Sequence, residues 1–127
     1  MLKIVLIFVG SGLGGTLRYA LSGWIQRMTT GAFPIGTLLV NVTGCFLIGF
    51  LTTALSGRVM IREEYRVALL VGVLGGYTTF STFGWETFVL LNDGQYWRAA
   101  LNAGASLILG LAAVWGGYRL AEHWLGV

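Results

Sequence analysis

Apolar residues occur along this chain in four long runs that are almost free of charge. The runs cover residues 4–17, 35–57, 67–85 and 99–118. A helix of roughly 20 apolar residues can cross the hydrocarbon core of a bilayer, which is about 30 Å thick. Since the first run is shorter, we expect its helix to continue past Arg18 to about Trp24, with the arginine near one membrane interface. The pattern predicts an all-α protein with four transmembrane helices.

Three short polar segments connect the apolar runs. They cover residues 27–34, residues 58–66 and the tight-turn sequence Asn92-Asp93-Gly94. Short connections make neighbouring helices antiparallel, so we expect one four-helix domain over residues 1–127, with both termini on the same side of the membrane. Five Lys/Arg residues are expected on the side of the termini and three on the other. This bias weakly favours cytoplasmic termini and is small enough to permit insertion in both orientations.

Composition supports a membrane protein and excludes several other classes. Hydrophobic residues make up 56% of the chain and charged residues only 10%, against about 25% charged in soluble proteins. Cys45 is the single cysteine, which rules out an intrachain disulfide. No basic helix or aromatic-basic array suggests a nucleic-acid partner. Many of the 20 glycines must lie in helices, and two G-x-x-x-G motifs, at residues 10–14 and 72–76, predict close helix contacts.

Three of the expected helices carry more polar residues than helix packing needs. Thr37 and Asn41 share one helix face, as do Asn102 and Ser106, because each pair is four residues apart. Any one of these side chains could simply bond a helix backbone or bridge two helices. Together with the hydroxyls of residues 77–82, however, they offer many neutral donors and few acidic groups. Such a lining suits a small anion better than a cation.

The stretch GGYTTFSTF, residues 75–83, is the most unusual part of the third apolar run. Two adjacent glycines followed by two threonines predict a break in the helix near Gly75 and Gly76. A break frees backbone carbonyls, which must then bond water, side chains or a small monovalent cation. The residues alone leave these three partners open. Phe80, Phe83 and Glu86 follow at a spacing of three and share one face.

At these residues the chain resembles the small bacterial fluoride channels of the CrcB or Fluc family. The resemblance is carried by Gly10, Gly14 and Arg18 in the first helix, by GTLLVNVTGCFLIG over residues 36–49, and by GVLGGYTTFSTFGWE over residues 72–86. It extends over essentially the whole chain. It implies a fluoride-selective channel rather than an enzyme, which passively exports cytoplasmic fluoride and lowers its toxicity. It also implies an antiparallel, dual-topology homodimer in the lipid bilayer, with two pores and one structural Na⁺ at the interface.

The resemblance further implies roles for particular residues. The backbone carbonyls of Gly75 and Thr78 from each subunit would bind the sodium ion. Asn41 would be a donor lining the pore, and the ring edges of Phe80 and Phe83 would face fluoride. Arg18 would sit in a vestibule and attract anions. The other residues of the fluoride path would be Thr37, Ser81, Thr82, Ser106 and Glu86.

The fourth helix departs from the pattern of the family. Some members have a tyrosine where this chain aligns Asn102, and a serine where it aligns Gly110. The fourth helix therefore contributes different side chains to the wall of the path, and Ser106 is the best candidate in it.

Two other functions compete with a channel. A proton-coupled exporter of small cations would use Glu86, the one acidic residue inside the apolar runs, but it would not need the hydroxyls of GGYTTFSTF. An intramembrane hydrolase would need a base beside a Ser or Thr hydroxyl. The single histidine, His123, lies near the C-terminus, where an interfacial position is the simpler interpretation.

Overall fold

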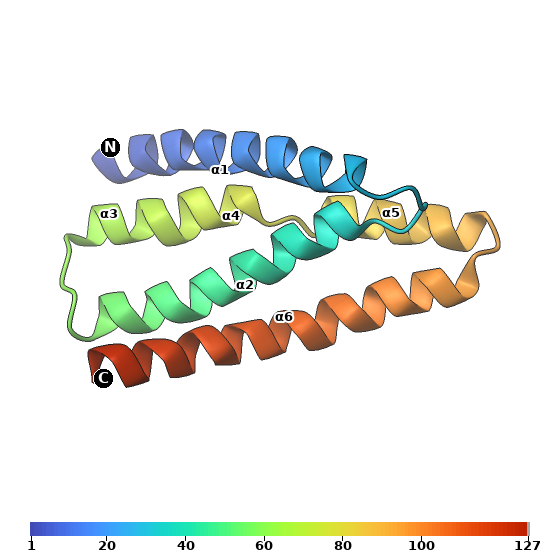
Figure 1. Ribbon diagram of the computed structural model, residues 1–127. Helices are drawn as coiled ribbons and strands as arrows, with labels where there is room; N and C mark the ends of the chain where they lie inside the picture. Colours follow the sequence, from blue (N-terminus) through green and yellow to red (C-terminus); the bar gives the residue numbers. More distant parts are fainter. Residues whose placement is uncertain (127) are drawn as a thin grey trace.

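The computed structural model describes residues 1–126, and the regular elements of this part are all helices. Three helices are continuous: α1 (Leu2–Arg27), α2 (Ile35–Ser56) and α6 (Tyr96–Leu125). The segment between α2 and α6 is divided (Figure 1). It consists of α3 (Glu63–Val67), the π-helix η1 (Ala68–Val73), α4 (Leu74–Tyr77) and α5 (Ser81–Asn92).

Four helical segments are long and apolar enough to cross a membrane: α1, α2, the divided segment Glu63–Asn92, and α6. This confirms the prediction of four spans with a broken third helix. Two predicted bounds differ from the structure. The first helix continues to Arg27, three residues beyond the predicted end, and Arg18 lies inside it as expected. The second connection is shorter than expected, because α3 already begins at Glu63.

The four spans form two closely packed pairs. α2 packs mainly along α6, and α1 packs along η1 and α4 (Figure 1). α1 also contacts α2, while α5 contacts α6, which joins the two pairs. Both chain ends lie at the same end of the bundle, as the four-span prediction requires. The break between α4 and α5 falls inside the third span.

Glycines bring the backbones of α1 and the third span into direct contact. A Cβ atom added at Gly10 would lie 2.8 Å from the Ala68 carbonyl oxygen, and one added at Gly14 would overlap the Val73 carbonyl oxygen. From the other side, a Cβ at Gly72 would lie 3.0 Å from the Ile7 carbonyl oxygen. The two G-x-x-x-G motifs therefore pack against one another. This confirms the prediction of close helix contacts at these glycines, and the structure adds the partner of each motif.

A second set of glycines joins α2 to α6. A Cβ added at Gly49 would overlap the Val114 carbonyl oxygen, and one added at Gly117 would overlap the Phe46 carbonyl oxygen. Few large side chains are fully buried, and Val40 and Asn102 are the largest of them among residues 1–126. Close backbone contact, rather than a thick apolar core, thus holds the helices together.

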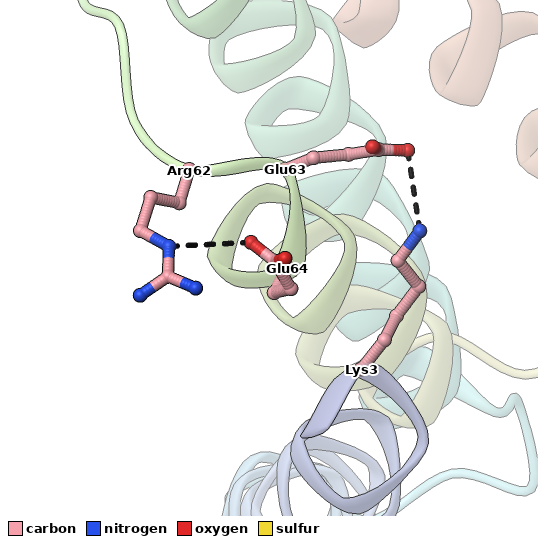
Figure 2. A network of polar contacts seen from close by, with 4 residues as sticks. All are labelled: Lys3, Arg62, Glu63 and Glu64. Carbon is pink, nitrogen blue, oxygen red and sulfur yellow. Dashed lines mark hydrogen bonds and ion pairs between the residues drawn. The ribbon is translucent and has the colours of Figure 1, made fainter. Parts of the chain in front are cut away.

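Charged residues gather at the end of the bundle that holds the chain termini (Figure 2). Lys3 Nζ lies 3.3 Å from Glu63 Oε1, which links the start of α1 to the start of α3. Arg62 Nε lies 3.4 Å from Glu64 Oε2, and its guanidinium lies 5.5 Å from the centre of the Tyr65 ring. Exposed ion pairs of this kind contribute about 1 kcal/mol or less each. They mark the water-facing end of the third span.

Substituting Gly14 tests the backbone contact between α1 and the third span. We expect Gly14→Ala to lower the free energy of unfolding by about 1–3 kcal/mol, because the methyl group collides with the rigid Val73 backbone. Gly12→Ala is the matched control on the same helix, since a Cβ there meets no atom within 4 Å. The control should be neutral or slightly stabilising. Thermal unfolding of both variants in detergent measures the difference, and equal midpoints would contradict the packing.

Candidate functional site

The third span is interrupted directly after Tyr77. Thr78 has φ −89° and ψ 157°, an extended conformation, and the helix resumes only at Ser81. The predicted break was therefore placed about one turn too early, since Gly75 and Gly76 are both inside α4. Gly76 serves a different purpose there: a Cβ at this position would lie 3.0 Å from the Ser11 Cα atom of α1.

Asn41 of α2 bonds the interrupted backbone with both ends of its side-chain amide. Its Nδ2 donates to the Thr79 carbonyl oxygen at 2.9 Å, and its Oδ1 accepts the Thr79 N–H at 2.8 Å. An amide that both donates and accepts is well suited to replace two missing helical hydrogen bonds. Asn41 thus satisfies both polar groups of the residue at the centre of the break.

Threonine hydroxyls close the two helix ends that flank the break. Thr78 Oγ1 donates to the Leu74 carbonyl at 2.9 Å, at the end of α4. Thr79 Oγ1 accepts the Thr82 N–H at 3.1 Å, at the start of α5. Such local bonds from Thr side chains are a common way to end one helix and begin another. The Thr78 hydroxyl thus gives its hydrogen to the backbone, whereas the Thr79 hydroxyl accepts a backbone N–H and keeps its own hydrogen.

α2 lies directly against the break. Gly44 leaves room for Thr78, because a Cβ at this position would overlap the Thr78 Cγ2 methyl group. The hydroxyls of Thr43 and Tyr77 share a hydrogen bond of 2.8 Å. Together with Asn41, these contacts fix the broken segment to α2 over about one turn of helix.

A cavity of about 460 Å³ opens beside the break. It lies between α2, the third span and α6, and its wall is mostly apolar. It brings together six of the residues singled out in the sequence: Asn41, Gly75, Thr78, Phe80, Phe83 and Ser106. Residues from three helices that are distant in sequence thus meet at one place.

The other predicted path residues lie outside this cavity. Thr37, Ser81 and Thr82 are absent from its wall. Glu86 lines a separate cavity of about 300 Å³, near the α1–α2 connection and the turn at Asp93. Within residues 1–126, no hydrogen-bond partner reaches the buried Glu86 Oε1 or the buried Ser106 Oγ. Ser106 lines the first cavity, and its buried hydroxyl is unpaired within the described residues.

Two aromatic rings stand where the cavity meets the surface of the subunit. The ring centres of Phe80 and Phe83 are 5.7 Å apart, with an angle of 42° between the planes. Phe80 is 83% exposed, although it lies in the middle of a transmembrane segment. The edges of such rings carry partial positive charge. The wall of the cavity thus combines two phenylalanine rings with hydroxyl and amide side chains, and it contains no acidic side chain.

Comparison with known proteins shows the family of the chain. The family model described as CrcB-like protein, camphor resistance (CrcB), matches residues 5–118. The chain belongs to the CrcB-like family. A fluoride-specific ion channel FluC from Solibacter usitatus is 47% identical over 96% of this chain and 100% of its own length. The FluC of Geobacter metallireducens is 46% identical over 97% of this chain and 99% of its own length.

Sequence reasoning overlooked several polar contacts of this CrcB-family chain. The Thr79 backbone was not expected to be the partner of Asn41. Asn102, only 2% exposed, donates through Nδ2 to Thr87 Oγ1 at 2.9 Å, and Thr87 donates to the Phe83 carbonyl at 2.8 Å. Asn102 thus joins α6 to the helix that carries Phe83. A polar residue with no obvious partner in the sequence was the only signal for this contact.

Arg18 also has a partner that was not expected. Its Nε donates to the Gly76 carbonyl at 3.1 Å, so the side chain reaches across to the end of α4. The predicted role of Arg18 in a vestibule stays a prediction, because the structure describes a single subunit.

Replacing Asn41 with aspartate tests its double bond to Thr79. The carboxylate can still accept the Thr79 N–H, but its second oxygen faces the Thr79 carbonyl, and two acceptors repel. We expect Asn41→Asp to lower the free energy of unfolding by about 2–3 kcal/mol and to speed hydrogen exchange at residues 78–82. The control Asn92→Asp makes the same chemical change at an exposed position. Equal exchange in both variants would contradict the role given to Asn41.

Proposed function

We propose that this protein is a fluoride-selective channel that passively exports fluoride from the cytoplasm. The proposal rests on one observation above all: the break in the third span lines a cavity with neutral donors and phenylalanine edges, in a chain whose relatives are named fluoride-specific ion channels. Hydrogen fluoride is a weak acid that crosses membranes and dissociates in a more neutral cytoplasm. The trapped anion then leaves through the channel down its electrochemical gradient.

Selectivity follows from how the cavity replaces water around the anion. Fluoride is strongly hydrated, so a path must offer donors without binding so tightly that exit is slow. The free Ser106 hydroxyl offers one donor. Asn41 keeps a second amide hydrogen beyond the one given to Thr79. The edges of Phe80 and Phe83 add several weak contacts. In the proposed path, Thr37, Ser81, Thr82 and Glu86 carry the ion further along the third span.

The proposed assembly is an antiparallel homodimer with two pores. A single subunit leaves Phe80 83% exposed and the cavity open on one side. A second copy would cover both, and eight helices enclose an aqueous path more readily than four. The small difference in Lys/Arg between the two sides is compatible with insertion in both orientations. In this assembly Arg18 would face a vestibule through its remaining guanidinium N–H groups.

A structural sodium ion between the two subunits is part of the proposal. Gly75 and Thr78 both line the cavity, and a Cβ at Gly75 would meet no atom within 4 Å, so the backbone there is accessible. Within residues 1–126, no hydrogen bond reaches the carbonyl oxygens of these two residues. Carbonyls at a helix C-terminus also carry partial negative charge. The residues therefore fit a cation that takes oxygen ligands, and its contribution would be to hold the two breaks together.

The two competing functions find less support in the structure. Glu86, the residue that a proton-coupled exporter would need, lines the cavity near the turn at Asp93 and not the cavity beside the break. His123, the base that a hydrolase would need, lies in the last turn of α6, at the end of the bundle with the chain termini (Figure 1). Membership of a channel family likewise favours transport over catalysis.

Anion efflux from liposomes tests the proposed function. Purified protein is reconstituted in liposomes loaded with potassium fluoride or potassium chloride, and valinomycin is added to carry the compensating potassium. We expect rapid fluoride efflux and chloride efflux close to that of empty liposomes. Folded protein that releases no fluoride would refute the channel, and comparable release of chloride would refute its selectivity.

Three variants test the proposed lining in the same assay. We expect Asn41→Asp to abolish fluoride efflux, because it loses a donor and adds negative charge. Phe80→Ile and Phe83→Ile should each slow efflux by at least about tenfold, since they keep an apolar side chain but remove the ring edge. Phe88→Ile is a control in the same span, at an exposed phenylalanine outside the cavity. Efflux near that of the control in all three variants would refute the lining.

A further inference from the structure

The break leaves a set of carbonyls at the end of α4 whose helical partners have been diverted. In a regular helix each carbonyl accepts the N–H of the residue four positions later. The Thr79 N–H, which would bond Gly75, is accepted by Asn41 Oδ1 instead. The Thr82 N–H, which would bond Thr78, is accepted by Thr79 Oγ1. Side chains thus take the donors that would otherwise occupy the carbonyls of Gly75 and Thr78.

Two carbonyls lie between these, those of Gly76 and Tyr77, and the Gly76 carbonyl has a side-chain partner. It accepts Arg18 Nε at 3.1 Å. Arg18 lies four residues after Gly14 and therefore on the same face of α1, where glycines bring α1 against α4. The close backbone contact gives the guanidinium a short, fixed reach to the Gly76 carbonyl. An arginine inside a membrane helix is costly unless it has such a partner.

We propose that Arg18 is a positioning residue that orients the break by binding the Gly76 carbonyl, so that the carbonyls of Gly75 and Thr78 face the cavity. A peptide plane held on one side restricts the rotation of its neighbours, because the Gly76 carbonyl shares its backbone with both adjacent peptides. Arg18 thereby selects which oxygens of the broken segment are presented. The effect of Arg18 on sodium binding rests on the proposed function, because it requires the proposed sodium site. The effect of Arg18 on the conformation of the break does not require that site.

A positioning role and a purely electrostatic role for Arg18 predict opposite effects on sodium binding. A guanidinium near a cation site repels the cation, so a purely electrostatic Arg18 would weaken sodium binding and its removal would tighten it. A positioning Arg18 has the opposite effect, since its removal disorders the carbonyls and weakens binding. Lysine separates charge from geometry, because it keeps the positive charge but lacks the planar guanidinium.

The test uses the full chain in detergent with three variants. Wild type, Arg18→Met, Arg18→Lys and the control Arg98→Met are titrated with Na⁺ against a large organic cation at constant ionic strength, and the thermal midpoint is recorded. Arg98 is a suitable control because its guanidinium bonds the side chain of Gln95 in the exposed turn before α6. Hydrogen exchange of residues 74–82 is measured in the same samples.

We expect the midpoint of wild type to rise with Na⁺ and to saturate. Both Arg18 variants should need at least about tenfold more Na⁺ for half of the effect, and exchange at residues 74–82 should be faster. Arg98→Met should match wild type in both measurements. Arg18→Lys keeps the test decisive if Arg18→Met does not fold, because it removes the planar guanidinium without burying a new apolar group.

Three outcomes would overturn the inference. Tighter Na⁺ binding in Arg18→Met, or wild-type behaviour in Arg18→Lys, would assign Arg18 to electrostatics alone. Unchanged hydrogen exchange at residues 74–82 in both variants would show that Arg18 does not orient the break. A wild type that does not respond to Na⁺ would refute the proposed sodium site by itself, and hydrogen exchange would then decide the role of Arg18 without reference to the ion.

Discussion

A backbone hydrogen bond that is missing inside a lipid bilayer must be replaced, because no water is present to satisfy the exposed groups. The third span of this protein breaks its helix after Tyr77 and so creates several such groups at membrane depth. Side chains from the surrounding helices form hydrogen bonds with some of these groups. Asn41 bonds both polar groups of Thr79, and Arg18 bonds the Gly76 carbonyl. Gly75 and Thr78, whose carbonyls accept no hydrogen bond within the described residues, line the cavity, and the proposed ion chemistry depends on these carbonyls.

Small residues make these replacements possible. Gly10, Gly14, Gly72 and Gly76 bring α1 and the third span so close that a side chain from one helix reaches the backbone of the other. Gly44 does the same between α2 and Thr78. A hydrophobic driving force is weak between helices in lipid, so close contact and hydrogen bonds must supply the stability. The hydrogen bonds of the polar site therefore depend on the close packing at the glycines.

Much of this could be predicted from the sequence. Four apolar runs and short connections predicted the spans, and paired glycines predicted close helix contacts without naming which helices meet. The position of the break was predicted about one turn too early, because Gly75 and Gly76 look like helix breakers locally. In the structure Gly76 provides the small surface that α1 needs, and Thr78 adopts the extended conformation. The π-helix η1 also left no signal in the pattern, since its residues are as apolar as those of an α-helix.

Several residues that line the cavity were predicted from the sequence, but the hydrogen bonds around the break were not. Asn41, Phe80, Phe83 and Ser106 were singled out by residue type and spacing, and the structure brings them together. That Asn41 holds the Thr79 backbone, or that Arg18 reaches Gly76, depends on how neighbouring helices cross, which spacing along one chain does not specify. Residue type, spacing and the family resemblance together identified the residues. The arrangement in space then shows which of them bond the interrupted backbone and which only line the cavity.

Selective conduction of fluoride is tested most directly by the reversal potential of the current through a planar bilayer that contains the protein. With a fluoride gradient in one direction, a chloride gradient in the other and equal potassium on both sides, the current should reverse at the fluoride equilibrium potential. A current that reverses near the chloride or potassium equilibrium potential would contradict fluoride selectivity.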